Sequence, residues 1–411
     1  MAKNLKKFVN ISFLRTVDLV LMRELLVRHE AQLRDFDVAD FDRKPSEVRS
    51  VLQNFFAGPE ERYPEGLTAD LHRIAELADQ NGLRLLLERA AALRKELIPK
   101  QEAEGHHLNP KHVALRTFLQ HPDVFEAASD FLAIETRISL TEFSGPEENV
   151  HPEINDQVRK DFERGAGQLL VRDLLSSYCR IGWYEDDDEL NVVVTHGEAI
   201  VITQRVKDGV EEPLTYRPVG HTNLAYDAVE GRLKVGGIAK ALRPKMAEIF
   251  AATVLKRPGF FSGDGCQDLY TLEPIERRGM GFVMDHSFDP GISRAAIVEV
   301  EARKLPGEEA VEGSPSPWSV VMRDRHNALQ RLGNVAPRIG FGEYGYGLGY
   351  IIIATSIETG GKRPAKLRVK VKPPHTAAFK RHRFEGRIME LLRRNKLCCE
   401  RKSGASAAAA E

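Results

Sequence analysis

Charged side chains near position 300 have the residue types that a metal-dependent nuclease uses. Asp285 follows a predicted strand at 281–284, and Glu299, Glu301 and Lys304 lie on or just after a second predicted strand. If the two strands formed a hairpin, their carboxylates could hold a metal ion that activates water for attack on a phosphodiester. The two glutamates also alternate with apolar residues, which is equally typical of a plain strand with one solvated face. The sequence therefore leaves catalysis open and favours a protein that is not an enzyme.

The basic residues near the carboxyl end give the strongest functional signal. Between Gly361 and Lys402 there are fifteen Lys or Arg residues and only three acidic residues, in a chain whose formal net charge is −1. This segment carries +12, so the rest of the chain carries −13. A positive surface of this kind is typical of proteins that bind a phosphate-rich partner.

The basic segment contains a predicted strand, a basic cluster and a predicted helix. Residues 366–372 alternate Lys or Arg with Leu or Val, so a strand would place its cations in one row and its apolar residues on the core face. Beyond this strand, Phe379 and Phe384 flank a basic cluster, which suits backbone contact with base stacking. The residues that we predict to contact nucleic acid are Lys366, Arg368, Lys370, Lys372, Lys380, Arg381, Arg383 and Arg387.

The same charge is compatible with two roles that need no nucleic acid. Lysine-rich edge strands discourage aggregation between sheets, and cations near a helix C-terminus interact favourably with the helix dipole, so part of the charge needs no ligand. Alternatively, the basic end could dock against the acidic remainder of the chain or against a protein partner. The excess of +12 leads us to favour nucleic acid over both alternatives.

The remaining motifs are weak. Residues 340–345 match a GxGxxG pattern, but the segment that follows is aromatic and β-branched, whereas a dinucleotide site needs a helix there. The acidic run 185–189 could collect a divalent cation, although such runs are more typical of a solvated turn. The four cysteines show no CxxC spacing. We therefore expect no cofactor and no bound metal.

Composition indicates a globular protein with more than one domain. The 411 residues are 42 % hydrophobic and 29 % charged, and a chain of this length exceeds the size of one hydrophobic core. Few, irregularly spaced cysteines favour reduced thiols. No stretch approaches the roughly 20 apolar residues of a membrane span. We expect a cytoplasmic protein that does not enter a membrane.

Hydrophobic periodicity predicts an α+β fold: a helical N-terminal domain, then a mostly antiparallel sheet domain that ends in a basic strand and helix. Within the helical part, Asn109 and Pro110 predict a helix start, because Asn caps well and Pro suits the first helical position. The predicted segments are a helical domain at 1–135, an acidic helical connection at 136–189, an antiparallel α+β domain at 190–335, a Gly-rich and basic strand–helix segment at 336–402, and a disordered tail at 403–411.

Two short segments resemble a known family. The run YTLEPIERRG at 270–279, followed by AAIVEVEARKLPG at 295–307, is similar to the middle of Rex-type phage-exclusion proteins. Members of that family bind DNA in bacterial antiviral defence. The resemblance covers under a tenth of the chain. It implies a cytoplasmic, DNA-binding defence component and identifies no functional residue.

Together these observations predict a nucleic-acid-binding protein, with DNA favoured over RNA. Because the sequence has no helix-turn-helix, RNP or zinc-finger signature, we expect phosphate-dominated contacts with weak sequence specificity. The alternatives are a metal-dependent nuclease that uses a 285–304 hairpin, and a protein-interaction subunit of a larger complex. A homo-oligomer is compatible with each of them.

Overall fold

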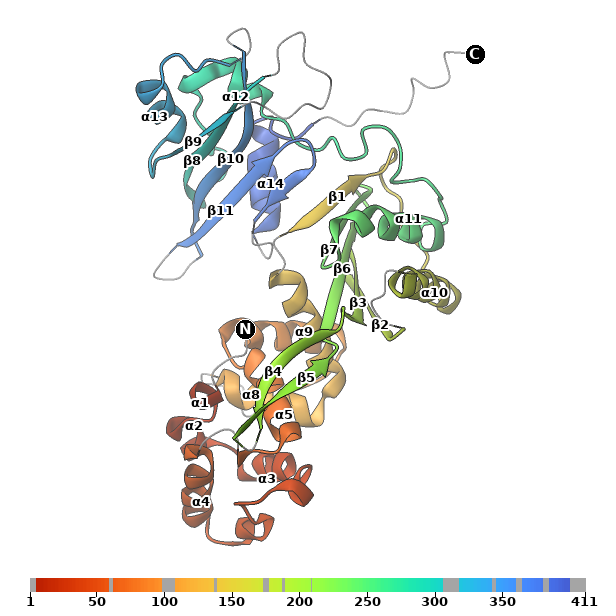
Figure 1. The fold of residues 1–411 in the computed structure, drawn as a ribbon, viewed down its shortest axis with the longest axis vertical. Helices are drawn as coiled ribbons and strands as arrows, with labels where there is room; N and C mark the ends of the chain where they lie inside the picture. The colour runs from red at the N-terminus through yellow and green to blue at the C-terminus, as the bar shows by residue number, and fades with distance from the viewer. Residues whose placement is uncertain are drawn as a thin grey trace. The chain divides into compact units, whose positions relative to one another are not determined.

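The computed structural model confirms the α+β class: helices predominate early in the chain and antiparallel sheets follow (Figure 1). The chain divides into two compact units, Met1–Ala133 and Ile134–Glu411. The structure describes residues 5–58, 62–97, 108–136, 139–172, 177–186, 189–207, 209–305, 318–341, 345–359, 364–379 and 384–399.

The first unit is built from short helices. Several begin at a side chain that caps the first free backbone amides. Asn109 is one of these caps: its Oδ1 accepts a hydrogen bond from Lys111 N at 3.0 Å, and Pro110 is the first helical residue, as predicted. The helices are α1 (Leu5–Phe8), α2 (Ile11–Thr16), α3 (Leu19–Val27), α4 (Pro45–Ala57), α5 (Glu65–Glu76), α6 (Gln80–Ala92), α8 (Pro110–Gln120) and α9 (Pro122–Thr136), the last of which runs into the second unit.

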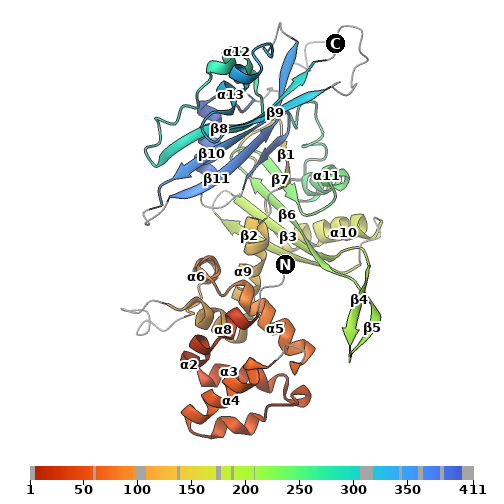
Figure 2. The same ribbon diagram turned by 60° about the vertical axis from the view of Figure 1, so that its left-hand side comes forward.

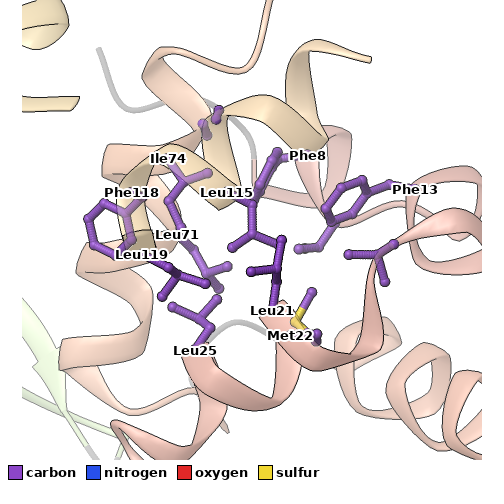
Figure 3. Close-up of a cluster of buried hydrophobic side chains, with 14 of the residues drawn as sticks. Phe8, Phe13, Leu21, Met22, Leu25, Leu71, Ile74, Leu115, Phe118 and Leu119 are labelled. Carbon is purple, nitrogen blue, oxygen red and sulfur yellow. The ribbon is translucent and has the colours of Figure 1, made fainter. Parts of the chain in front are cut away.

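One hydrophobic core holds these helices together (Figure 3). Leu21 and Leu25 of α3, Leu71 of α5, and Leu115 and Phe118 of α8 all contribute to it. Their side chains recur three or four positions apart on each helix, so each helix presents one apolar stripe to the others. Burial of such stripes is the main force that stabilises this unit.

The second unit contains two five-stranded antiparallel sheets. The first has the order β1-β7-β6-β3-β2, and helices α10 (Asp156–Arg172) and α11 (Arg243–Thr253) share its core. Phe162 and Phe250 of these helices pack in that core with Tyr226 of β6. The strands are β1 (Leu140–Ser144), β2 (Cys179–Asp186), β3 (Glu189–Gly197), β6 (Val219–Asp227) and β7 (Arg232–Gly236).

The second sheet has the order β12-β11-β10-β8-β9. Its core face is covered by α12 (Glu273–Arg278), α13 (Ala328–Val335) and α14 (Glu385–Arg394), whose apolar side chains share one cluster with β10 and β11. The strands are β8 (Ile292–Lys304), β9 (Ser319–Arg323), β10 (Tyr346–Ile357), β11 (Ala365–Lys372) and β12 (Thr376–Ala378). Residues on both sides of the predicted boundary at 335/336 therefore belong to the same sheet.

No helix in the described ranges has both the length and the apolarity that a bilayer crossing requires.

A two-stranded arm extends from the first sheet between β3 and β6 (Figure 2). It consists of β4 (Val201–Lys207) and β5 (Val210–Tyr216). Large apolar side chains on the arm face solvent: Ile202 and Val206 are each 72 % exposed. An isolated ribbon of this kind contributes little to stability in water. The antiparallel partners Gly197 and Val219 lie where the arm joins the sheet.

Because the arm joins directly opposed residues, its removal should leave the sheet intact. We expect replacement of residues 198–218 by Asn-Gly, a tight hairpin turn, to change the free energy of unfolding by less than about 1 kcal/mol. Leu233→Ala in the buried core of the same sheet should cost about 2–5 kcal/mol and serves as the positive control. Urea denaturation followed by circular dichroism measures both. Loss of cooperative unfolding on arm deletion would contradict the prediction.

Candidate nucleic-acid interface

The predicted basic row lies on strand β11. Lys366, Arg368 and Lys372 are exposed and Lys370 is half-buried, while Leu367, Val369 and Val371 are buried. The structure thus confirms the strand and its alternation. The apolar face packs against α14, and the cations occupy the opposite face of the sheet, which we call the outer face.

Neighbouring strands add further charge to the outer face. Cross-strand pairing aligns the β11 cations with Ile352, Ala354 and Ser356 of β10, and Ser356 in turn pairs with Arg294 of β8. Glu299 of β8 pairs with Arg323 of β9. The charged side chains of the outer face in the described strands are Lys366, Arg368, Lys370, Lys372, Arg294, Arg303 and Arg323, together with Glu299 and Glu301, which gives a net charge of +5.

Glu299 is the buried acid at the centre of this face. Its carboxylate accepts hydrogen bonds from Arg323 Nε at 2.8 Å and from the Tyr350 hydroxyl at 2.8 Å, and Arg368 Nη2 lies 3.7 Å away. The side chain is 8 % exposed. The hydrogen bond from Arg323 is the main reason that the pKa of Glu299 lies below its usual value. Burial, followed by the bond to Glu299, raises the pKa of Tyr350 to about 12.

Tyr350 also connects the acid to the basic row. The Lys370 ammonium lies 3.8 Å from the centre of the Tyr350 ring, a cation–π contact. Tyr350 is half-buried. Its hydroxyl donates a hydrogen bond to Glu299, and one face of its ring contacts the Lys370 ammonium. Glu299 therefore helps to fix side chains on β9, β10 and β11 from a single position on β8.

The structure does not form the hairpin that the nuclease alternative requires. The predicted strand at 281–284 is wrong: η5 (Gly279–Gly281) is followed by an irregular segment that reaches β8. Asp285 lies in this segment and accepts hydrogen bonds from Ser287 N at 2.9 Å and Ser287 Oγ at 2.7 Å. These bonds form a local turn.

The other nuclease candidates are engaged elsewhere. Glu301 accepts from Arg303 Nη2 at 2.6 Å, Glu299 accepts from Arg323, and Lys304 is exposed at the end of β8. Within the described part of the chain, no group of three or more His, Cys, Asp or Glu side chains is arranged to hold a metal ion. The geometry therefore gives the nuclease alternative no support.

The predicted basic helix lies on the opposite layer from the basic row. Helix α14 packs on the core face, and its cations pair with acids of the protein itself. Arg387 Nε lies 3.6 Å from Asp289, and Arg394 Nε donates to Glu390 at 2.7 Å. Arg387 is therefore separated from the outer face, and its charge is already balanced.

The basic cluster between β12 and α14 is only partly described. Lys380, Arg381 and Arg383 lie outside the described residues. Phe379 and Phe384, which flank them, are buried in the core of the second sheet. The expected stacking role of these two rings is therefore wrong, because a buried ring has no free face for a base.

Sequence reasoning missed part of the outer face. Arg294, Arg303 and Arg323 come from strands far from the basic segment, and only the pairing register brings them beside it. The alternation of Glu299 and Glu301 with apolar residues indicated one solvated face on β8, but it gave no sign of which strand would lie alongside.

The Glu299 network should make stability depend on pH. A carboxyl whose pKa is depressed on folding stabilises the protein above its unfolded pKa of about 4.3, and this contribution disappears as the pH falls through the folded pKa. We expect Glu299→Gln to cost about 1–3 kcal/mol at pH 7, because it removes hydrogen bonds from a charged donor, and we expect this difference to shrink below about pH 4.

Urea denaturation across this pH range measures the effect. Glu301→Gln is the matched control, since its carboxylate pairs with Arg303 on the same strand. A difference between wild type and Glu299→Gln that stays constant down to pH 3 would contradict the role assigned to this carboxylate.

No protein-family model matches the chain, and no curated protein matches it in sequence. The resemblance to Rex-type proteins receives no support from these comparisons.

Proposed function

We propose that this protein binds nucleic acid through the outer face of the second sheet. The observation that carries the proposal is the gathering of seven cationic side chains, from β8, β9 and β11, on one solvated face that contains two acids. One of the acids, Glu299, is almost fully covered by its partners. The face therefore presents mainly guanidinium and ammonium groups to solvent.

The spacing of the row suits a polymer of phosphates. Alternate residues of a strand are about 6.6 Å apart, so the four cations from Lys366 to Lys372 span about 20 Å. A duplex carries phosphates at about 3.4 Å intervals per strand along its axis, so the row can face several of them at once. Lys and Arg contacts of this type position nucleic acid without reading its sequence, which gives weak sequence specificity.

The preference for DNA over RNA rests on the resemblance to Rex-type proteins. On that resemblance alone, the proposal extends to a component of bacterial antiviral defence. A protein-interaction subunit is the second candidate, and the exposed apolar side chains of the β4–β5 arm favour it.

Charge reversal on β11 tests the first proposal. We expect the triple variant Lys366→Glu, Lys370→Glu, Lys372→Glu to weaken binding of a labelled DNA duplex by at least about 100-fold at 0.1 M salt, because each removed cation contacts a phosphate. The slope of log K against log[salt] should fall in magnitude by about three. Fluorescence anisotropy titrations at several salt concentrations measure both quantities.

A matched triple variant distinguishes the effect of the β11 cations on binding from the effect of total charge. Lys160→Glu, Lys240→Glu and Lys245→Glu make the same charge change at exposed positions away from the second sheet, and binding should stay within a few-fold of wild type. Equal weakening by both triples, or no salt-dependent binding by wild type, would refute the proposed surface. Duplex RNA and single strands in parallel test the DNA preference, and added Mg²⁺ shows whether any substrate is cleaved.

A further inference from the structure

We propose that the helical unit carries a separate binding site for a small amphipathic anion, a molecule with one carboxylate or phosphate joined to an apolar group. The site is an open cavity of about 680 Å³ bordered by the α2–α3 junction, α4 and α8. All of its lining residues belong to the first unit. Its volume lies within the range of about 300–1,000 Å³ that is typical of small-molecule sites.

The walls of the cavity are largely apolar. Val17, Leu21, Val113 and Leu115 line it and are buried, and Pro45 at the start of α4 also lines it. Leu21 and Leu115 also belong to the core cluster shown in Figure 3, so this wall is part of the hydrophobic core of the unit. An apolar group that enters the cavity would contact a preformed surface.

Two of the three charged side chains that line the cavity, leaving aside His112, are cationic. Arg49 is held in place by its Nη1, which donates to the carbonyls of Leu14 at 2.9 Å and Val17 at 3.1 Å. Arg116 lines the same cavity from α8. The one acid in the lining, Asp18, caps α3 by accepting from Val20 N at 2.9 Å. Helices α3 and α8 both begin at this cavity, where Asp18 and Asn109 accept hydrogen bonds from their first amides.

His112 lies among these charges. Its Nε2 is 3.2 Å from Thr16 Oγ1, and its ring packs against Phe13 with centroids 5.3 Å apart. Burial, and then the charge of Arg116, lowers the pKa of His112; Lys111 of α8 and Arg49 of α4 act in the same direction, and Asp18 opposes them. The imidazole is therefore neutral at pH 7, in surroundings where cations outnumber acids.

An anion in the cavity would oppose the effect of these cations on the pKa of His112. Its negative charge would offset Arg49 and Arg116 and would favour the protonated imidazole, so binding would be coupled to proton uptake by His112. The affinity for an anion should consequently rise as the pH falls from about 7.5 to about 5.5. A neutral molecule with the same apolar group would show no such dependence.

Isothermal titration of the full chain tests this site with octanoate, with phenyl phosphate, and with octanol as the uncharged counterpart of octanoate. We expect one saturable site per chain for octanoate or phenyl phosphate and weaker binding of octanol. Octanoate, which stays mainly ionised over this range, should bind several-fold more tightly at the lower pH, whereas phenyl phosphate is compared at about pH 7.5 only because it titrates near pH 6 itself. The anion that binds more tightly identifies carboxylate or phosphate as the preferred group.

Val20 provides a variant that should not disturb folding. It lines the cavity, is 73 % exposed and lies in the first turn of α3, where an acidic residue is compatible with the helix dipole. Val20→Glu should weaken anion binding by about ten-fold or more through repulsion, whereas Val20→Gln, which has a similar shape and no charge, should bind like wild type.

Several results would overturn the proposal. These are the absence of saturable binding of either anion at about 1 mM, equal binding of octanol and octanoate, and equal anion affinity for Val20→Glu and Val20→Gln. The proposal does not depend on nucleic-acid binding, because the β11 charge-reversal variant keeps every residue of the cavity and should retain its anion affinity.

Discussion

Burial of one face of the second sheet under three helices determines where its charges lie. Side chains of a strand alternate between the two faces, so once Leu367, Val369 and Val371 pack against α14, the intervening cations must lie on the other face. A shift of one residue in register would bury the whole row and expose the apolar residues. The basic surface and the core are therefore two consequences of the same pairing.

Glu299 shows how this face tolerates its own charge. Several cations on adjacent strands repel one another, and a buried carboxylate with three hydrogen-bonding or ionic partners offsets that repulsion at the centre of the sheet. The cost of burying the acid is met by the bonds that it accepts, since an unpaired buried carboxylate would be strongly unfavourable. Glu299, which the sequence suggested as a metal ligand, thus has an electrostatic role that requires no metal ion.

Local pattern predicted the elements better than it predicted their neighbours. The alternation at 366–372 was sufficient to predict that strand and its buried face. At 281–284 the same signal failed. Phe282 and Met284 are buried and Val283 is exposed, as in a strand, but Asp285 N bonds to the side chain of Asn395 at 2.8 Å in place of a neighbouring strand. Alternation of apolar and polar residues indicates which side chains are buried, but a strand also requires a neighbouring strand for its backbone hydrogen bonds.

The same distinction limits what a count of charges can say about binding. The basic segment carries +12, but Arg387, Arg393 and Arg394 lie on the core side of the sheet, beside Asp289, Glu230 and Glu390. The outer face gains instead from Arg294, Arg303 and Arg323, which a sequence window around the basic segment does not contain. The described strands of the outer face carry a net charge of +5, drawn from a different set of residues than the +12 of the basic segment. The number of counterions that a bound polymer would release depends on how many of these cations contact phosphates.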